Sequence, residues 1–279
     1  MRIRAGFEIT YDCPAPTPMT LLLSVRPERL PDLVTTQRIT ASGQARLRQY
    51  RDMFGNIAHR LLAPAGPTTF AADFVISDPG LPDIVDLAAV QHPVETLPDE
   101  VLVYLAGSRY CETQLLSPLA WLLFEGTAPG WARVQAIVDY VHNRIEFGYP
   151  HARPTRTAAE AHEEGRGVCR DFAHLAVTLC RCMNIPARYC TGYLGDIGIA
   201  PIDAPMDFSA WFEVYLGGAW RTFDARHNTP RIGRILMAYG RDAADVAITT
   251  SFGMAQLTRF GVVTEQVCEA PAERVLKRA

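Results

Sequence analysis

The pattern of apolar and polar residues along the chain changes near Gly130 and again near Pro186. Before Gly130, short apolar runs alternate with turn residues, a pattern typical of hairpins in an antiparallel sheet. The strands expected from these runs cover residues 3–11, 19–25, 45–50 and 70–76. Residues 78–100 are rich in proline and aspartate and are the expected linker.

After Gly130 the apolar residues recur at helical spacing, beginning with Trp131, Val134 and Ile137. This first helix is expected to end near 144–148, and a second helical stretch passes through 158–161. A third, strongly apolar helix starts at Cys169, and Pro186 stops it.

Strand patterns then return at 187–194, 210–216, 220–224, 245–250 and 256–266, and Gly217-Gly218 is a two-residue hairpin signal. The sequence therefore predicts an α+β protein. Residues 1–105 are expected to form an amino-terminal β-sandwich-like domain, and residues 106–279 an α+β core that includes the carboxy-terminal strands.

Composition and charge mainly exclude certain classes of protein and of binding partner. The 279 residues are 48% hydrophobic and 20% charged, as in ordinary globular proteins. A net charge of -3 gives no global field for recruiting nucleic acid or an anionic membrane. Because no signal-like run and no apolar stretch of roughly 20 residues is present, we expect a cytoplasmic protein without a membrane partner.

The seven cysteines are odd in number and scattered, unlike a disulfide framework. Cys180, Cys182 and Cys190 fall within eleven residues and raise the question of a metal site. On a helix, however, Cys180 and Cys182 point about 200° apart, so they do not converge on one ion. We expect these thiols to pack in the core and to hold no metal.

Cys169 follows a glycine-bearing turn and opens its helix, where unpaired N–H groups and the helix dipole favour a thiolate. A thiol nucleophile also needs a base and a group that orients the base. If Gly217-Gly218 is the turn of a hairpin, Ser209 and Asp224 project from the same sheet face as diagonal neighbours, roughly 7–8 Å apart.

Several motifs together carry a family resemblance. They are Gly167-Val168-Cys169-Arg170-Asp171-Phe172-Ala173-His174, Asn184-Ile185-Pro186-Ala187-Arg188-Tyr189, Gly192-Tyr193, Ala210-Trp211-Phe212-Glu213-Val214-Tyr215, and Trp220 with Phe223-Asp224. In this order and spacing they resemble the nucleophile region of the transglutaminase-like superfamily, over roughly 115–265. The β-rich first hundred residues are similar to the amino-terminal β domain of bacterial members.

The resemblance implies a papain-like α+β core with a Cys-His-Asp triad. By position, Cys169 is the implied nucleophile and Asp224 the orienting acid, whereas Ser209 stands where the family has its histidine. The implied activity is thiol acyl transfer through an acyl-thioester, as in a cysteine peptidase or amidase acting on a peptide or other amide, without a cofactor. The alternative is a catalytically degenerate domain that serves as a peptide-binding or assembly module.

A serine hydroxyl cannot replace imidazole as a base near neutral pH, so another histidine must fill the role if the site is active. His227 lies three residues past Asp224, but strand alternation places it on the opposite face unless the strand ends or bulges first. His174 is expected on a polar stripe of the Cys169 helix, beside Thr178 and Arg181, as a surface or packing residue.

The remaining histidines are weaker candidates. His142 and His151 flank the loop before the Cys169 helix, and nothing in the sequence fixes their direction. His162 is expected in a solvated stretch, whereas His59 and His92 belong to the β half and the linker.

Three further features have two interpretations each. Trp211 either lines a substrate groove and the oxyanion site or anchors the sheet to the helix. The cluster of Arg226, Arg231 and Arg234 either receives an acidic substrate group or, as we favour, forms a solvated face. Asp171 either caps the Cys169 helix or opposes thiolate formation.

Overall fold

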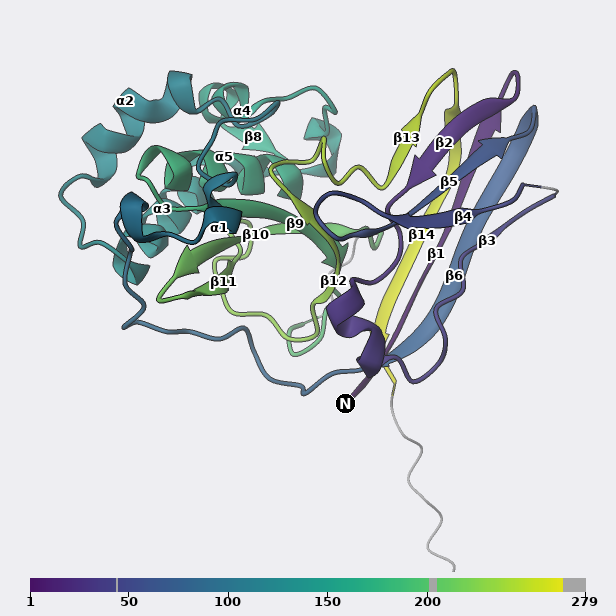
Figure 1. Ribbon diagram of the computed structural model, residues 1–279, viewed down its shortest axis with the longest axis horizontal. Coiled ribbons are helices and arrows are strands. Elements are labelled where there is room, and N and C mark those ends of the chain that lie inside the picture. Colours follow the sequence, from purple (N-terminus) through teal and green to yellow (C-terminus); the bar gives the residue numbers. More distant parts are fainter. Residues whose placement is uncertain (44, 201–204, 268–279) are drawn as a thin grey trace, which may run out of the picture.

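The computed structural model describes residues 1–43, 45–200 and 205–267. It has two parts, a β sandwich and an α+β core (Figure 1). The sandwich consists of two four-stranded antiparallel sheets with the orders β14-β1-β6-β3 and β13-β2-β5-β4. Their strands are β1 (Arg2–Cys13), β2 (Thr17–Leu21), β3 (Thr40–Ala41), β4 (Arg48–Arg51), β5 (Ile57–Ala63), β6 (Gly66–Ser77), β13 (Thr249–Ser251) and β14 (Gln256–Gln266).

The carboxy-terminal strands lie in this sandwich. β14 pairs with β1 from Ile3↔Gln266 to Asp12↔Gln256, and β13 pairs with β2. The sequence-based division assigned both strands to the 106–279 unit, whereas their pairing places them in the first two sheets. The α+β core is therefore an insertion between β6 and β13, and the 105/106 boundary itself stays a prediction.

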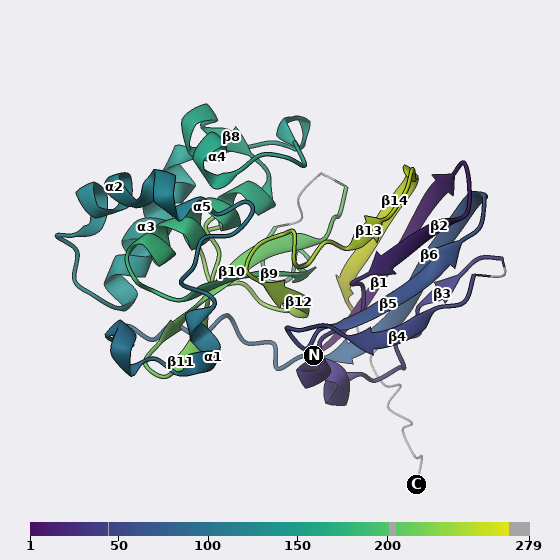
Figure 2. The same cartoon turned by 45° about the horizontal axis from the view of Figure 1, so that its top comes forward.

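The core combines helices with a third sheet of order β11-β10-β9-β12. The helices are α1 (Asp99–Leu102), α2 (Thr113–Phe124), α3 (Trp131–Arg144), α4 (Ala158–Glu164) and α5 (Cys169–Cys182), with short 3-10 turns at Pro27–Asp32, Val94–Thr96 and Tyr149–His151. The strands are β9 (Ala187–Tyr193), β10 (Ser209–Leu216), β11 (Ala219–Phe223) and β12 (Ile235–Gly240), and β7 (Glu146–Phe147) pairs in parallel with β8 (Arg166–Gly167). Helix α5 packs on β9 and β10, with α2, α3 and α4 around it (Figure 2). The predicted α+β class is confirmed.

Helix α5 is buried on all sides after its first turn. The prediction that one side of this helix is a polar stripe at the surface is therefore wrong. His174, Thr178 and Arg181 are at most 3% exposed. Arg181 donates to three backbone carbonyls, and Nε2 of His174 accepts the N–H of Ala243 at 3.1 Å. Loop backbone thus covers the polar side of the helix, and burial lowers the pKa of His174 well below its usual value.

The sandwich and the core share an apolar cluster that joins β1 and β6 to β9 and β12. Phe208 lies in this cluster, with its ring 6.2 Å from that of Phe7, 5.1 Å from Tyr193 and 6.0 Å from Phe260. The segment that leads into β10 is therefore held in place by the sandwich.

The hairpin of β10 and β11 has the predicted register, from Leu216↔Ala219 to Phe212↔Phe223. Gly217 and Gly218 adopt φ values of 59° and 79°, which suit the turn of a two-residue hairpin. Pairing stops at Phe223, one residue before Asp224. In the described ranges, no helix combines the length and the apolar character needed to cross a membrane.

Candidate active site

The start of α5 is fixed by Asp171. Its Oδ2 accepts the backbone N–H of Val168 at 2.9 Å and an N–H of Arg156 at 3.0 Å, and its Oδ1 is 3.1 Å from Arg170. Asp171 is fully buried. The capping interpretation of Asp171 is confirmed, and two guanidinium groups balance its charge.

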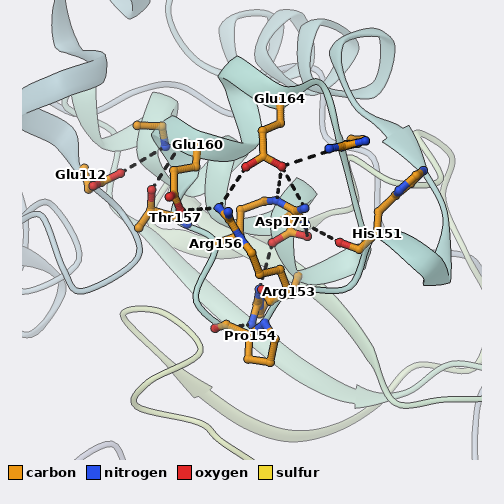
Figure 3. A network of polar contacts seen from close by, with 12 residues as sticks. Glu112, His151, Arg153, Pro154, Arg156, Thr157, Glu160, Glu164 and Asp171 are labelled. Atoms are coloured by element: carbon orange, nitrogen blue, oxygen red, sulfur yellow. Dashed lines mark hydrogen bonds and ion pairs between the residues drawn. The ribbon is translucent and has the colours of Figure 1, made fainter.

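Arg156 ties this cap to the preceding loop and to α4 (Figure 3). It donates to Oε2 of Glu164 at 3.0 Å and to the backbone carbonyl of His151 at 2.6 Å, and Arg153 pairs with the same Glu164. The loop therefore has a fixed position beside the amino terminus of α5, where Cys169 lies.

Cys169 is partly exposed in a cavity of about 370 Å³. Five segments contribute to its wall, at 147–152, 168–169, 194–196, 205–209 and 226–231. Cys169, Ser209 and His227 all line this space. The structure thus brings together the predicted nucleophile, the serine at the family's histidine position, and an imidazole from a different element.

The imidazole of His227 is held by Asp224, with Nδ1 and Oδ2 2.8 Å apart. Strand alternation predicted the opposite face for His227, but β11 ends before Asp224. Oδ1 of Asp224 accepts the backbone N–H groups of Arg226 and His227, both at 3.0 Å, and its carbonyl accepts the N–H of Asn228 at 2.8 Å. These bonds form a turn that folds His227 back onto the carboxylate.

Asp224 is ionised because Arg234 also contacts it. Nη2 of Arg234 is 2.9 Å from Oδ2 of Asp224, and Nε of Arg234 binds Asp83 of the linker. Burial opposes ionisation of Asp224, but Arg234 and the hydrogen bonds from His227 outweigh it and hold the pKa well below its usual value. An ionised carboxylate accepts the Nδ1–H of His227 and leaves Nε2 as the basic nitrogen.

The thiol of Cys169 is protonated at neutral pH. Burial raises its pKa to about 11, although Arg226 and the backbone N–H of Ala210 favour the thiolate. Asp207 and Asp224 act against the thiolate. The helix start favours a thiolate, but burial together with these carboxylates acts in the opposite direction on the pKa of Cys169.

Ser209 opens β10, opposite Gly192 of β9, and is 5% exposed. Its Oγ has no hydrogen-bond partner among the described residues. Ser209 is thus a lining residue whose own Oγ is buried, and the imidazole of the site comes from His227 instead.

Trp211 is 2% exposed and is absent from the wall of the Cys169 cavity. The guanidinium of Arg234 lies 5.0 Å from its ring centre, and a Cβ on Gly192 would come within 2.9 Å of the ring. The structure therefore favours the packing interpretation of Trp211 over the one in which it lines a substrate groove.

The prediction that the arginine cluster forms a solvated face is also wrong. Arg231 and Arg234 are buried, with 4% and 9% exposure, and Arg231 donates to the carbonyl of Gly195. Arg226 lines the cavity and stacks 3.7 Å from the centre of the Phe147 ring.

The other histidines lie outside the cavity wall. Nδ1 of His142 donates to the carbonyls of Ala225 and Arg226, at 3.1 and 3.0 Å, and so supports the turn from behind. His162 is not solvated as expected, because its Nε2 is hydrogen-bonded to the Tyr140 hydroxyl at 2.7 Å. His151 takes part through its backbone carbonyl.

The predicted core cysteines Cys180, Cys182 and Cys190 are buried. In the part of the chain that the structure describes, no group of three or more His, Cys, Asp or Glu residues is arranged to hold a metal ion. Cys268 lies outside the described residues.

Residues 123–225 match the transglutaminase-like superfamily, a span that holds Cys169, Ser209 and Asp224. This chain carries a transglutaminase-like core. The same core occurs in a crystal structure named as that of a "Putative Cysteine Protease" from Cytophaga hutchinsonii. That structure is 29% identical, with a TM-score of 0.82, and the match covers 97% of this chain and 92% of the other.

The chain is also similar to a protein of Mycobacterium leprae. An uncharacterized protein of that bacterium is 36% identical over 91 residues, which is 32% of this chain and 32% of the relative. The match thus spans about a third of either protein, whereas the Cytophaga structure is similar across both the sandwich and the core.

Proposed function

We propose that this protein is a thiol acyl-transfer enzyme that hydrolyses a peptide or other amide, with Cys169 as nucleophile and His227 as base. One observation carries the proposal: an imidazole held by a buried, ionised carboxylate lines the same cavity as the cysteine. A nucleophile, a base and a group that orients the base are the parts this chemistry needs.

Acylation begins with the neutral thiol, since burial raises the pKa of Cys169 to about 11. Nε2 of His227 takes the thiol proton as Sγ bonds to the amide carbon, so His227 acts as a general base. The imidazolium that results is stabilised by Asp224 at 2.8 Å. It then gives its proton to the leaving amine, the C–N bond breaks, and an acyl-thioester remains on Cys169.

Deacylation uses the same groups in reverse. Water attacks the thioester carbon and loses a proton to His227, the C–S bond breaks, and the thiolate takes the proton back. The products are a carboxylic acid and the free thiol. Ser209 lines the cavity beside Cys169 and His227, but its Oγ is buried, so these steps assign it no proton transfer.

The alternative, a binding or assembly module without turnover, has its own support. The pKa of Cys169 is raised rather than lowered, and Ser209 stands at the position of the family's histidine. The two functions differ in one respect: only the enzyme needs the His227 imidazole for its reaction with an acyl donor.

The test uses p-nitrophenyl acetate as acyl donor, with intact mass to detect acetyl-Cys169 and nitrophenolate release to measure turnover. We expect acetylation and turnover in the wild type and neither at this site in Cys169→Ala. His227→Gln should lower the rate by about 10²- to 10⁴-fold, the usual contribution of a general base. His162→Gln, a histidine outside the cavity, is the matched control and should keep the wild-type rate. Unchanged turnover in His227→Gln would overturn the proposal.

A further inference from the structure

Arg226 is the cationic side chain placed nearest in the chain to the proposed base. It sits in the turn between Asp224 and His227, and its backbone N–H donates to Oδ1 of Asp224 at 3.0 Å. Its side chain lines the Cys169 cavity and rests 3.7 Å from the centre of the Phe147 ring. The guanidinium is therefore held by a rigid turn on one side and by an aromatic face on the other.

The guanidinium of Arg226 has no carboxylate partner within 4.0 Å among the described residues, in contrast to Arg234 and Arg156. Arg234 pairs with Asp83 and Asp224, and Arg156 pairs with Asp171 and Glu164. Those two arginines are structural. Arg226 instead faces the cavity, with the Phe147 ring and the Tyr149 hydroxyl as its neighbours.

Arg226 acts on the thiol itself. It is the strongest of the influences that favour the Cys169 thiolate, and the two residues line the same cavity. Asp207 lines the same cavity and acts on the thiol in the opposite sense, but burial raises its pKa and its carboxylate is hydrogen-bonded to the backbone of Phe208. Asp207 is thus a weakened competitor for the guanidinium rather than its ion-pair partner.

We propose that Arg226 binds a carboxylate of the substrate close to the scissile amide, so that the substrate class is an anionic amide or peptide. The proposal rests on the proposed function for the reacting bond, but the binding step stands on the cavity alone. A guanidinium recognises a carboxylate through a planar pair of N–H donors. At about 370 Å³ the cavity is at the small end of ligand sites, which suits a single acidic residue or a carboxyl terminus.

Two alkylating reagents of nearly equal size provide the test. In both, the Cys169 thiolate displaces iodide from a methylene carbon, but iodoacetate carries a carboxylate and iodoacetamide a neutral amide. The rate of each reaction at Cys169 is measured by peptide mass spectrometry on the full chain. The ratio of the two rates is divided by the same ratio for glutathione, which removes the intrinsic reactivity of the thiol.

We expect the wild-type ratio to exceed that of glutathione by about tenfold or more, the effect of one charge-assisted hydrogen bond. Arg226→Gln should bring the ratio down to that of glutathione, and Arg226→Lys should keep part of the preference. Asp207→Asn, which removes the competing carboxylate, should match or exceed the wild type. A wild-type ratio equal to that of glutathione, or a preference that survives in Arg226→Gln, would overturn the proposal.

Failure of the proposed function gives a different result. Alkylation needs no turnover, so His227→Gln should keep the preference for iodoacetate even after losing hydrolysis. If the protein never hydrolyses an acyl donor but shows the Arg226-dependent preference, the hydrolase proposal fails while carboxylate binding at Arg226 is supported. The thermal midpoint of Arg226→Gln checks that the variant is folded.

Discussion

The substitution Asp224→Asn tests the buried charge at the centre of the site. Oδ1 of Asp224 accepts two backbone N–H groups, and Oδ2 accepts His227 and Arg234 at 2.8 and 2.9 Å. Every one of these partners is a donor. Because asparagine has one acceptor and one donor at these places, either orientation of its amide sets an NH₂ group against two donors.

The expected loss of stability is about 3–5 kcal/mol, the usual cost of breaking a buried ion pair by removing one partner. Total stabilities lie near 5–15 kcal/mol, so this is a large share. Asp83 still holds Arg234, which favours the lower end of the range. Each kcal/mol shifts the thermal midpoint by about 2–4 °C in chains of 150–250 residues, so a fall of roughly 6–20 °C is expected in differential scanning calorimetry.

The stability that the Asp224 carboxylate contributes should also fall as the pH is lowered. The folded pKa of Asp224 lies well below its unfolded value of about 3.9, so the carboxylate contributes its full stability above that pH. Below about pH 4 the unfolded chain takes up the proton first, and the wild type loses about 1.4 kcal/mol per pH unit through this group. The gap between wild type and Asp224→Asn should therefore narrow on acidification. A fall of less than 2 °C at pH 7, or a gap that does not change with pH, would refute an ionised Asp224.

Three further outcomes follow from the structure. A Cβ at Gly167 would meet Oδ2 of the buried Asp171 at 2.6 Å, so Gly167→Ala should cost about 1–3 kcal/mol in urea unfolding, and a neutral result would contradict a fixed cap. Because burial raises the pKa of Cys169 to about 11, its rate of alkylation by iodoacetamide should keep rising from pH 7 towards 11, whereas a plateau below pH 8 would mean a preformed thiolate. Phe208→Ala should lower stability by about 3–5 kcal/mol by thermal unfolding, against less than about 0.5 kcal/mol for the 66% exposed Phe252→Ala, and equal effects would count against the shared core.

Local signals in the sequence were enough for much of the core. The period change at Gly130 located α3 and α5, and Gly217-Gly218 set the register of β10 with β11. These features depend on residues close in sequence. Strands β5 and β12 and helix α2 were missed. The pairing of β14 with β1, which joins residues as far apart as Ile3 and Gln266, was missed too.

The direction of the His227 side chain could not be predicted from strand alternation. Alternation predicts side-chain direction only while a strand continues, and β11 ends at Phe223 because the Asp224 carboxylate binds the next backbone N–H groups. Asp224, Asn228 and Pro230 are residue types that favour turns, and this signal was present in the sequence.

The burial of polar side chains could not be predicted from the sequence either. Arg181 and Arg234 look like surface residues in the sequence, yet loop carbonyls and the distant Asp83 satisfy their donors. The raised pKa of Cys169 has the same kind of cause, since it depends on walls from separate segments. Such partners become neighbours only in the tertiary fold.

The insertion of the core between β6 and β13 has a consequence for biosynthesis. Strand β1 precedes the core in sequence, whereas its partner β14 follows the whole core. While the core is being translated, β1 therefore has an open edge, and open edges invite pairing with other chains. The sandwich can close only after the core has been synthesised, because β2 of the second sheet likewise waits for β13. Both sheets are therefore exposed to misassembly while the core is being made.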